Sequence, residues 1–152
     1  MSVVARLEEH SLDPPKELGE LLRDVSGEGA VVSFVGLARS HSRAGTPLQA
    51  LVLEHHPVLT RQSLEDIAAA AAARFEASHI RVVHRCGVVA PGEPIVFAGA
   101  SSAHRRAAFE CADYLMDRLK TNAVFWKRET GEQGSEWIEP TDGDYADNSR
   151  WG

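Results

Sequence analysis

Apolar residues recur at helical spacing in three parts of this chain. The first covers residues 18–25 and follows a pair of prolines. The second covers 60–75 and contains an alanine run, which favours a helix. The third begins at Ser101 or Ser102, whose hydroxyls can cap a helix, and continues to about Thr121. The pattern therefore predicts three helices.

Short apolar or alternating runs predict the strands between these helices. Residues 30–35 are apolar and β-branched, which indicates a central, buried strand, and 48–54 could pair with it as a hairpin. Residues 80–83 and 94–98 predict a second hairpin, and two further short strands are expected over 124–129 and 136–138. A polar, aperiodic loop over 39–47 follows the first strand.

The order of these segments favours an α+β class, since helices and hairpins mix without strict β-α-β alternation. We expect one mixed, largely antiparallel sheet with two to three packed helices. A length of 152 residues fits a single domain over 1–152, and residues 1–13 and 141–152 are expected to be flexible ends.

Composition narrows the possible partners. Asp and Glu outnumber Lys and Arg by 22 to 16, a formal charge of -6, which disfavours nucleic acid and anionic membrane surfaces. With no long apolar run and no secretion signal at the start, the expectation is a cytoplasmic protein. Cys86 and Cys111 are far apart and are expected to be buried thiols rather than a disulfide.

Two lysines are the first candidates for chemistry. Lys120 ends the third helix and Lys127 lies in the strand that follows, on the same strand face as Phe125. Both could border one apolar-walled pocket, where desolvation and neighbouring cations would lower an amine pKa. Taken singly, each lysine also fits an ordinary structural role, either helix-dipole compensation or edge-strand solubility.

Anion-binding groups lie nearby in the sequence. His104 and Arg105 stand at a helix start, where backbone N–H groups favour anions, although a solvated first turn is the alternative. Arg39 enters the polar loop and offers a planar guanidinium. The seven histidines show no familiar ligand spacing, so the sequence predicts neither a metal site nor a cofactor.

Six motifs, taken together, resemble the molybdopterin synthase large subunit, the MoaE family, over roughly residues 29–139. They are Phe34-x-Gly36-x-x-Arg39-x-His41, Leu53-Glu54-His55-x-Pro57, His84-Arg85-x-Gly87, Pro91-Gly92-Glu93, Ser102-Ala103-His104-Arg105 and Met116-Asp117-x-Leu119-Lys120-Thr121-x-Ala123-x-Phe125-Trp126-Lys127-Arg128-Glu129. Each motif is weak alone, whereas their order and spacing are specific.

The resemblance implies an α/β hammerhead fold and a homodimer within a heterotetramer. A small ubiquitin-like MoaD-type subunit would dock at each end. Sulfur would pass from the thiocarboxylate at that subunit's C-terminus to cyclic pyranopterin monophosphate, forming the molybdopterin dithiolene.

The resemblance also implies the roles of the site residues. Lys120 would meet the partner's tail, and Lys127 would act as general acid/base. Arg39, His104 and Arg105 would hold the phosphate and pterin. The side chains of Phe34 and Met116 would form the pocket wall.

This chain departs from the family pattern at two positions. Val124 replaces a usual Pro, and Thr141 stands where many relatives have Arg. Two other functions remain open: a non-catalytic module that binds a phosphorylated pterin, and a scaffold that only docks a ubiquitin-like tail.

Overall fold

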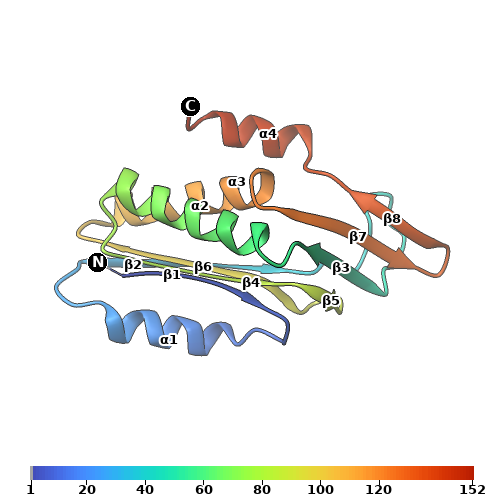
Figure 1. The fold of residues 1–152 in the computed structure, drawn as a ribbon, viewed down its shortest axis with the longest axis horizontal. Helices are drawn as coiled ribbons and strands as arrows, with labels where there is room; N and C mark the ends of the chain where they lie inside the picture. Colours follow the sequence, from blue (N-terminus) through green and yellow to red (C-terminus); the bar gives the residue numbers. More distant parts are fainter. Residues whose placement is uncertain (1) are drawn as a thin grey trace.

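The computed structural model describes residues 2–152, and these form eight strands and four helices (Figure 1). In chain order the elements are β1 (Ser2–Glu8), α1 (Pro14–Asp24), β2 (Ala30–Leu37), β3 (Ala50–His55), α2 (Leu59–Phe75), β4 (His79–Arg85), β5 (Gly87–Val89), β6 (Pro94–Ser102), α3 (Arg105–Thr121), β7 (Phe125–Gly131), β8 (Gly134–Ile138) and α4 (Asp142–Ser149).

The strands form two sheets of four, and this confirms the α+β class. The first sheet has the order β1-β4-β6-β2, with β1 parallel to β4 and the other pairs antiparallel. The second has the order β5-β3-β7-β8 and is antiparallel throughout. Helix α1 covers one face of the first sheet, and α2 and α3 cover the other (Figure 1). The sequence pattern predicts one sheet and no more than three helices, so the second sheet and the fourth helix are differences from the prediction.

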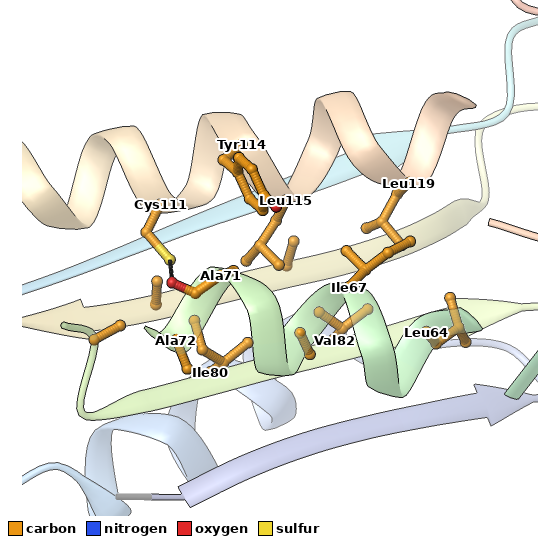
Figure 2. Close-up of a cluster of buried hydrophobic side chains, with 14 of the residues drawn as sticks. Leu64, Ile67, Ala71, Ala72, Ile80, Val82, Cys111, Tyr114, Leu115 and Leu119 are labelled. Atoms are coloured by element: carbon orange, nitrogen blue, oxygen red, sulfur yellow. Dashed lines mark hydrogen bonds between the residues drawn. The ribbon is translucent and has the colours of Figure 1, made fainter. Parts of the chain in front are cut away.

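The main core lies between the first sheet and the helices α2 and α3. Alanines on α2 let the two helices approach closely, and Cys111 packs directly over Ala71, as Figure 2 shows. Ala108, Ala112, Leu115 and Leu119 are all buried, which confirms the apolar stripe predicted for α3. Cys111, like Cys86 elsewhere, is a buried thiol without a disulfide, as expected.

On the opposite face, α1 is held by a buried ion pair as well as by apolar contact. Arg81 of β4 donates hydrogen bonds of 3.0 and 2.9 Å to one Glu17 oxygen, and Arg6 of β1 donates one of 2.7 Å to the other. Leu21 lies against Gly99, where a Cβ would come within 2.6 Å of the leucine side chain. A side chain at position 99 would therefore force Leu21 to move away from the sheet.

Two of the predictions about strands are wrong. Residues 30–35 belong to β2, which is an edge strand rather than a central one, and the predicted hairpin with 48–54 does not form because β3 lies in the other sheet. After β2 the chain instead binds the turn before β6, where the Ala38 N–H donates to the Glu93 carbonyl at 2.9 Å. The hairpin expected between 80–83 and 94–98 is confirmed as the pairing of β4 with β6.

The start of α3 also differs from the prediction. Ser101 and Ser102 are the last residues of β6, where both are buried, and His104 takes the cap position without a side-chain hydrogen bond. The serines are held in the strand because their backbone pairs with β2, as in the register of Ala30 with Ser102.

Both chain ends have regular structure where flexible ends were expected. Residues 2–8 form β1, in register with β4 along its whole length, although Met1 lies outside the described residues. Near the other end, α4 is held to α3 because the Trp151 indole donates to Asp117 at 2.7 Å and packs edge-on against Phe75 and Tyr114.

Candidate active site

A cavity of about 290 Å³ lies beside β7, between the second sheet, the end of α3 and the start of α4. Its apolar wall is formed by aliphatic side chains and one aromatic ring. These residues are Leu37, Leu51, Leu53, Ile95, Leu119, Ala123, Phe125 and Ile138. Charged side chains from four separate segments face the same space: Arg39, Arg43, Lys120, Lys127, Glu129, Glu139 and Asp144.

Alternation along β7 explains why three of these residues face the cavity together. Phe125, Lys127 and Glu129 are two residues apart, so their side chains leave the same face of the strand. The backbone of Lys127 pairs with Leu53 of β3 on one side and with Ile138 of β8 on the other. A strand held on both edges fixes the position of its lysine.

The Lys127 amine is in an environment that disfavours its charged form. Burial lowers its pKa to about 8, helped by repulsion from Lys120 and opposed by attraction to Asp144. At neutral pH such an amine exchanges protons far more readily than one with the usual pKa of about 10.4.

Lys120 is the second amine of the cavity and is exposed at its edge. It lies in the last turn of α3, and the chain then reverses through residues 122–124 into β7. The sequence prediction that both lysines border one apolar-walled pocket is thus confirmed. These are two of the only three lysines in the sequence.

Arg39 reaches the cavity from the loop after β2. Its guanidinium donates two hydrogen bonds to Glu129, with nitrogen–oxygen distances of 2.6 and 2.9 Å. The carboxylate is buried, while the arginine side chain is 42% exposed. This ion pair leaves part of the guanidinium open to a second anion.

Asp144 adds an acidic group from α4. Burial opposes its ionisation, but hydrogen bonds from Thr141 and the charges of Lys120 and Lys127 lower its pKa overall. Thr141 and Asp144 form a reciprocal capping box, each accepting a hydrogen bond of 2.9 Å from the other's backbone N–H. Thr141, which departs from the family pattern, thus helps to hold the Asp144 carboxylate near the Lys120 and Lys127 amines.

Behind the cavity, His84 is fully buried and stacks on Phe125 with ring centroids 4.2 Å apart. Burial, together with the positive charges of Lys127 and Lys120, lowers the pKa of His84 to about 4, against the hydrogen bond to the Arg85 carbonyl at 2.8 Å. The ring is therefore neutral and Nδ1 is the protonated nitrogen, because only a donor can bond to a carbonyl. His84 supports the wall and does not add charge.

Val124, the other departure from the family pattern, has a structural role. Its N–H donates to the Ser63 hydroxyl at 3.0 Å, and its carbonyl accepts from the Thr60 hydroxyl at 2.6 Å. A proline could not make the first bond because it has no N–H. This chain thus fixes the turn before β7 with two bonds to α2.

Four residues proposed as substrate-binding groups lie outside this cavity. Phe34 is 43% exposed on the edge strand β2, and Met116 packs against the main core. His104 and Arg105 are exposed at the first turn of α3, about 22 Å along the helix axis from Lys120. Within one chain, the structure brings together only Lys120, Lys127 and Arg39 of the proposed set.

Four charged members of the cavity were not predicted from the sequence: Arg43, Glu129, Glu139 and Asp144. Arg43 lies in the polar loop predicted over 39–47, but the direction of its side chain depends on the fold. The spacing of Thr141 and Asp144 resembles a capping box and could have indicated α4. Nothing in the sequence indicates that Glu129 is buried, because the burial of a carboxylate depends on the three-dimensional fold.

Fold and cavity together define an α+β protein with a pocket lined by two lysines and two arginines. The sequence model of the family described as MoaE protein matches residues 7–122 of this chain. The chain belongs to the MoaE family.

Individual relatives agree with this assignment. A molybdopterin synthase catalytic subunit from Caulobacter vibrioides is 50% identical over 123 residues, which is 81% of this chain and 80% of the relative. A MoaE protein from Burkholderia ambifaria superposes with a TM-score of 0.83 at 35% identity, covering 100% of this chain and 99% of that one.

A third relative comes from a protein–protein complex of subunits 1 and 2 of the molybdopterin-converting factor from Helicobacter pylori. It superposes with a TM-score of 0.68 at 19% identity and covers 93% of this chain and 90% of that one. At this identity the likeness supports the fold alone. Separately, none of the helices within residues 2–152 is both long and apolar enough to cross a membrane.

Proposed function

We propose that this chain is the catalytic subunit of a molybdopterin synthase, which transfers sulfur from the thiocarboxylated C-terminus of a small ubiquitin-like subunit to cyclic pyranopterin monophosphate. The observation that carries the proposal is the pairing of Lys120 and Lys127 at one cavity, with the pKa of Lys127 lowered to about 8. Family membership gives the reaction, and the cavity gives the groups for proton transfer and anion binding.

In this proposal Lys127 is the general acid/base. Sulfur addition to the pterin precursor requires proton transfer to and from the precursor. The half-buried Lys127 amine, with a pKa near 8, can both donate and accept a proton near neutral pH. The apolar wall keeps water away from the amine and so maintains the lowered pKa.

Lys120, at the exposed edge, receives the thiocarboxylate of the partner's tail. A shallow groove lined by Trp137, Thr141 and Gly143 adjoins the cavity and shares Arg43 and Glu139 with it. An extended peptide tail could lie along this groove and place its anionic end between the two amines. Membership of the MoaE family supports a small MoaD-type subunit as this partner.

The remaining substrate-binding residues require a second copy of the chain. Phe34, His104 and Arg105 cannot reach the cavity of their own chain, whereas a homodimer could bring them to the cavity of the other copy. The unpaired edge of β2 carries the exposed side chains of Phe34, Val35 and Leu37, which favours burial against another chain. Arg39 and these residues of the other copy would then hold the phosphate and pterin. A cytoplasmic location remains a prediction from the sequence.

The test is reconstitution of molybdopterin formation from this chain, a thiocarboxylated small subunit and the pterin precursor. Lys127→Ala is expected to lower the turnover rate by at least about 100-fold, the usual range for losing a general acid/base. Lys16→Ala, which removes the only lysine distant from the cavity, is the matched control. Unchanged turnover in Lys127→Ala would contradict the assigned role.

The same materials separate the two alternatives. A non-catalytic pterin-phosphate module would bind the precursor without turnover, and a docking scaffold would bind the small subunit but not the precursor. Calorimetry with each ligand alone distinguishes these outcomes.

A further inference from the structure

A second group of reactive side chains lies outside the cavity, at the end of the second sheet. The ligand atoms of Glu9, His55 and Cys86 all lie within 4.8 Å of one another. The three residues come from separate segments: the bend after β1, the end of β3 and the connection between β4 and β5. We propose that these three side chains bind a divalent transition-metal ion of the Zn²⁺ type.

The backbone holds the three segments together without any metal. The Cys86 N–H donates to the Glu8 carbonyl at 2.9 Å, which places Glu9 beside the cysteine. Leu53 pairs with Gly87, so the end of β3 passes the same point. Gly87 has φ of 86°, a left-handed conformation in which glycine has no side-chain strain, and it turns the chain directly after Cys86.

Each side chain is available to a ligand. Within residues 2–152, neither the Glu9 carboxylate, the His55 ring nor the Cys86 sulfur takes part in a side-chain hydrogen bond or an ion pair. The neighbouring acidic residues differ in this respect, because Glu8 lies 3.7 Å from Arg6 and Glu54 lies 3.5 Å from Arg128. The three residues share one groove, with the nearly buried cysteine at its floor and the exposed glutamate at its rim.

The chemistry of the donors selects the class of metal. A thiolate, an imidazole and a carboxylate are together typical of Zn²⁺, whereas Mg²⁺ and Ca²⁺ prefer oxygen ligands alone. In a tetrahedral zinc site neighbouring ligand atoms are about 3.5 Å apart, so a trio within 4.8 Å must close by no more than roughly 1.3 Å. Glu9 is exposed and His55 is half-buried, so the proposal assigns this closure to rotation of their side chains and leaves the fourth position to solvent.

Electrostatics agrees with a bound cation. The Glu9 carboxylate lies beside the Cys86 sulfur, and no ion pair neutralises it within residues 2–152. A divalent ion would balance both anionic groups. Cys111 cannot substitute for Cys86, because it is enclosed in the main core against Ala71.

The experiment titrates the full-length, tag-free and metal-stripped chain with Co²⁺, which replaces Zn²⁺ and gives a thiolate-to-metal charge-transfer absorption. Zn²⁺ binding is measured in parallel by calorimetry. We expect one equivalent of metal per chain and a thiolate band. Cys86→Ser should abolish the band, and Glu9→Gln and His55→Gln should each weaken Zn²⁺ binding by at least about tenfold. Cys111→Ser and Glu54→Gln are the matched controls and should keep both the band and the stoichiometry.

Three results would overturn the site: a wild-type chain that binds no equimolar metal, a thiolate band that survives in Cys86→Ser, or a band lost in Cys111→Ser. If Cys86→Ser does not fold, as judged by circular dichroism, the exposed-residue variants decide the question. Unchanged Zn²⁺ affinity in both Glu9→Gln and His55→Gln rejects the proposal. These measurements use no sulfur-transfer assay and so do not depend on the proposed function.

Discussion

Arg39 and Glu129 form a two-point ion pair, with the guanidinium donating to both carboxylate oxygens at 2.6 and 2.9 Å. The arginine that the sequence suggests for anion binding is therefore already engaged with a buried acid. An incoming phosphate must share or displace this partner. The carboxylate orients the guanidinium toward the cavity while limiting its affinity for other anions.

Replacing the acid should strengthen anion binding. In Glu129→Gln the Arg39 charge is no longer neutralised, so the affinity for inorganic pyrophosphate is expected to rise by up to about tenfold, equivalent to about 1.4 kcal/mol. Calorimetry measures this directly. Glu132→Gln, which changes an exposed acid in the turn after β7, is the control and should leave affinity unchanged. Weaker binding in Glu129→Gln would show that the acid only supports the fold.

Two substitutions should move the titration of Lys127 in opposite directions. Lys120 lowers the pKa of Lys127, so Lys120→Ala should raise that pKa above about 8 and move the corresponding limb of the kcat/KM profile to higher pH. Asp144 raises the same pKa, so Asp144→Asn should move the limb to lower pH. Lys16→Ala should leave the midpoint in place. Shifts of equal sign would rule out this electrostatic arrangement.

The C-terminal tryptophan should matter more to stability than an exposed one. Trp151→Ala removes contacts with Phe75 and Tyr114 and the hydrogen bond to Asp117, so the free energy of unfolding is expected to fall by about 2–3 kcal/mol. Trp137 is 57% exposed, and Trp137→Ala should cost less than about 1 kcal/mol. Chemical denaturation gives both values. Equal, small losses would instead favour the flexible end expected from the sequence.

Loss of the Thr141 hydroxyl should loosen α4 without unfolding the domain. Thr141→Ala removes half of the capping box and should destabilise the helix by about 1 kcal/mol, visible as faster amide hydrogen exchange over 142–149. Ser149→Ala, at the other end of the same helix, is the comparison and should change exchange little. Unaltered exchange in Thr141→Ala would mean that the contacts with α3, such as Arg118 with Asn148 and Trp151 with Asp117, hold α4 without the cap.

Mixed dimers test whether a second copy completes the site. A 1:1 mixture of Lys127→Ala and Arg105→Ala chains forms mixed dimers in which one cavity has both residues intact, if Arg105 acts across the interface. After subunit exchange, turnover should recover to about a quarter of wild type, since about half of the dimers are mixed and each has one intact site of two. If both residues act within one chain, mixing restores nothing.

Local patterns allowed the helices to be predicted better than the sheet pairings. The stripe from Ala108 to Leu119 identified α3 because helical spacing depends only on neighbouring residues. The partner of β2 could not be predicted in this way, since the choice between β3 and β6 depends on contacts distant in sequence. The start of α3 was misplaced for a similar reason: pairing with β2 holds Ser102 in a strand.

The two candidate sites also differ in how well the sequence predicts them. Lys120 and Lys127 are seven residues apart, so a helix end, a turn and a strand face were enough to place them together. Glu9, His55 and Cys86 lie on three distant segments, and no spacing motif could indicate that they meet. The sequence therefore gave no metal signature at the position where the fold assembles three donor atoms.

The two hydrogen bonds that Val124 makes with the first turns of α2 connect the segment between Lys120 and Lys127 to a helix that does not line the cavity. Thr60 and Ser63 bind the backbone about midway between Lys120 and Lys127. The distance between the two amines therefore depends on α2, which lies outside the cavity. A change such as Ser63→Ala should thus alter the spacing of the two amines without replacing any side chain that lines the cavity. The spacing of the two amines in this chain therefore depends in part on a helix outside the cavity.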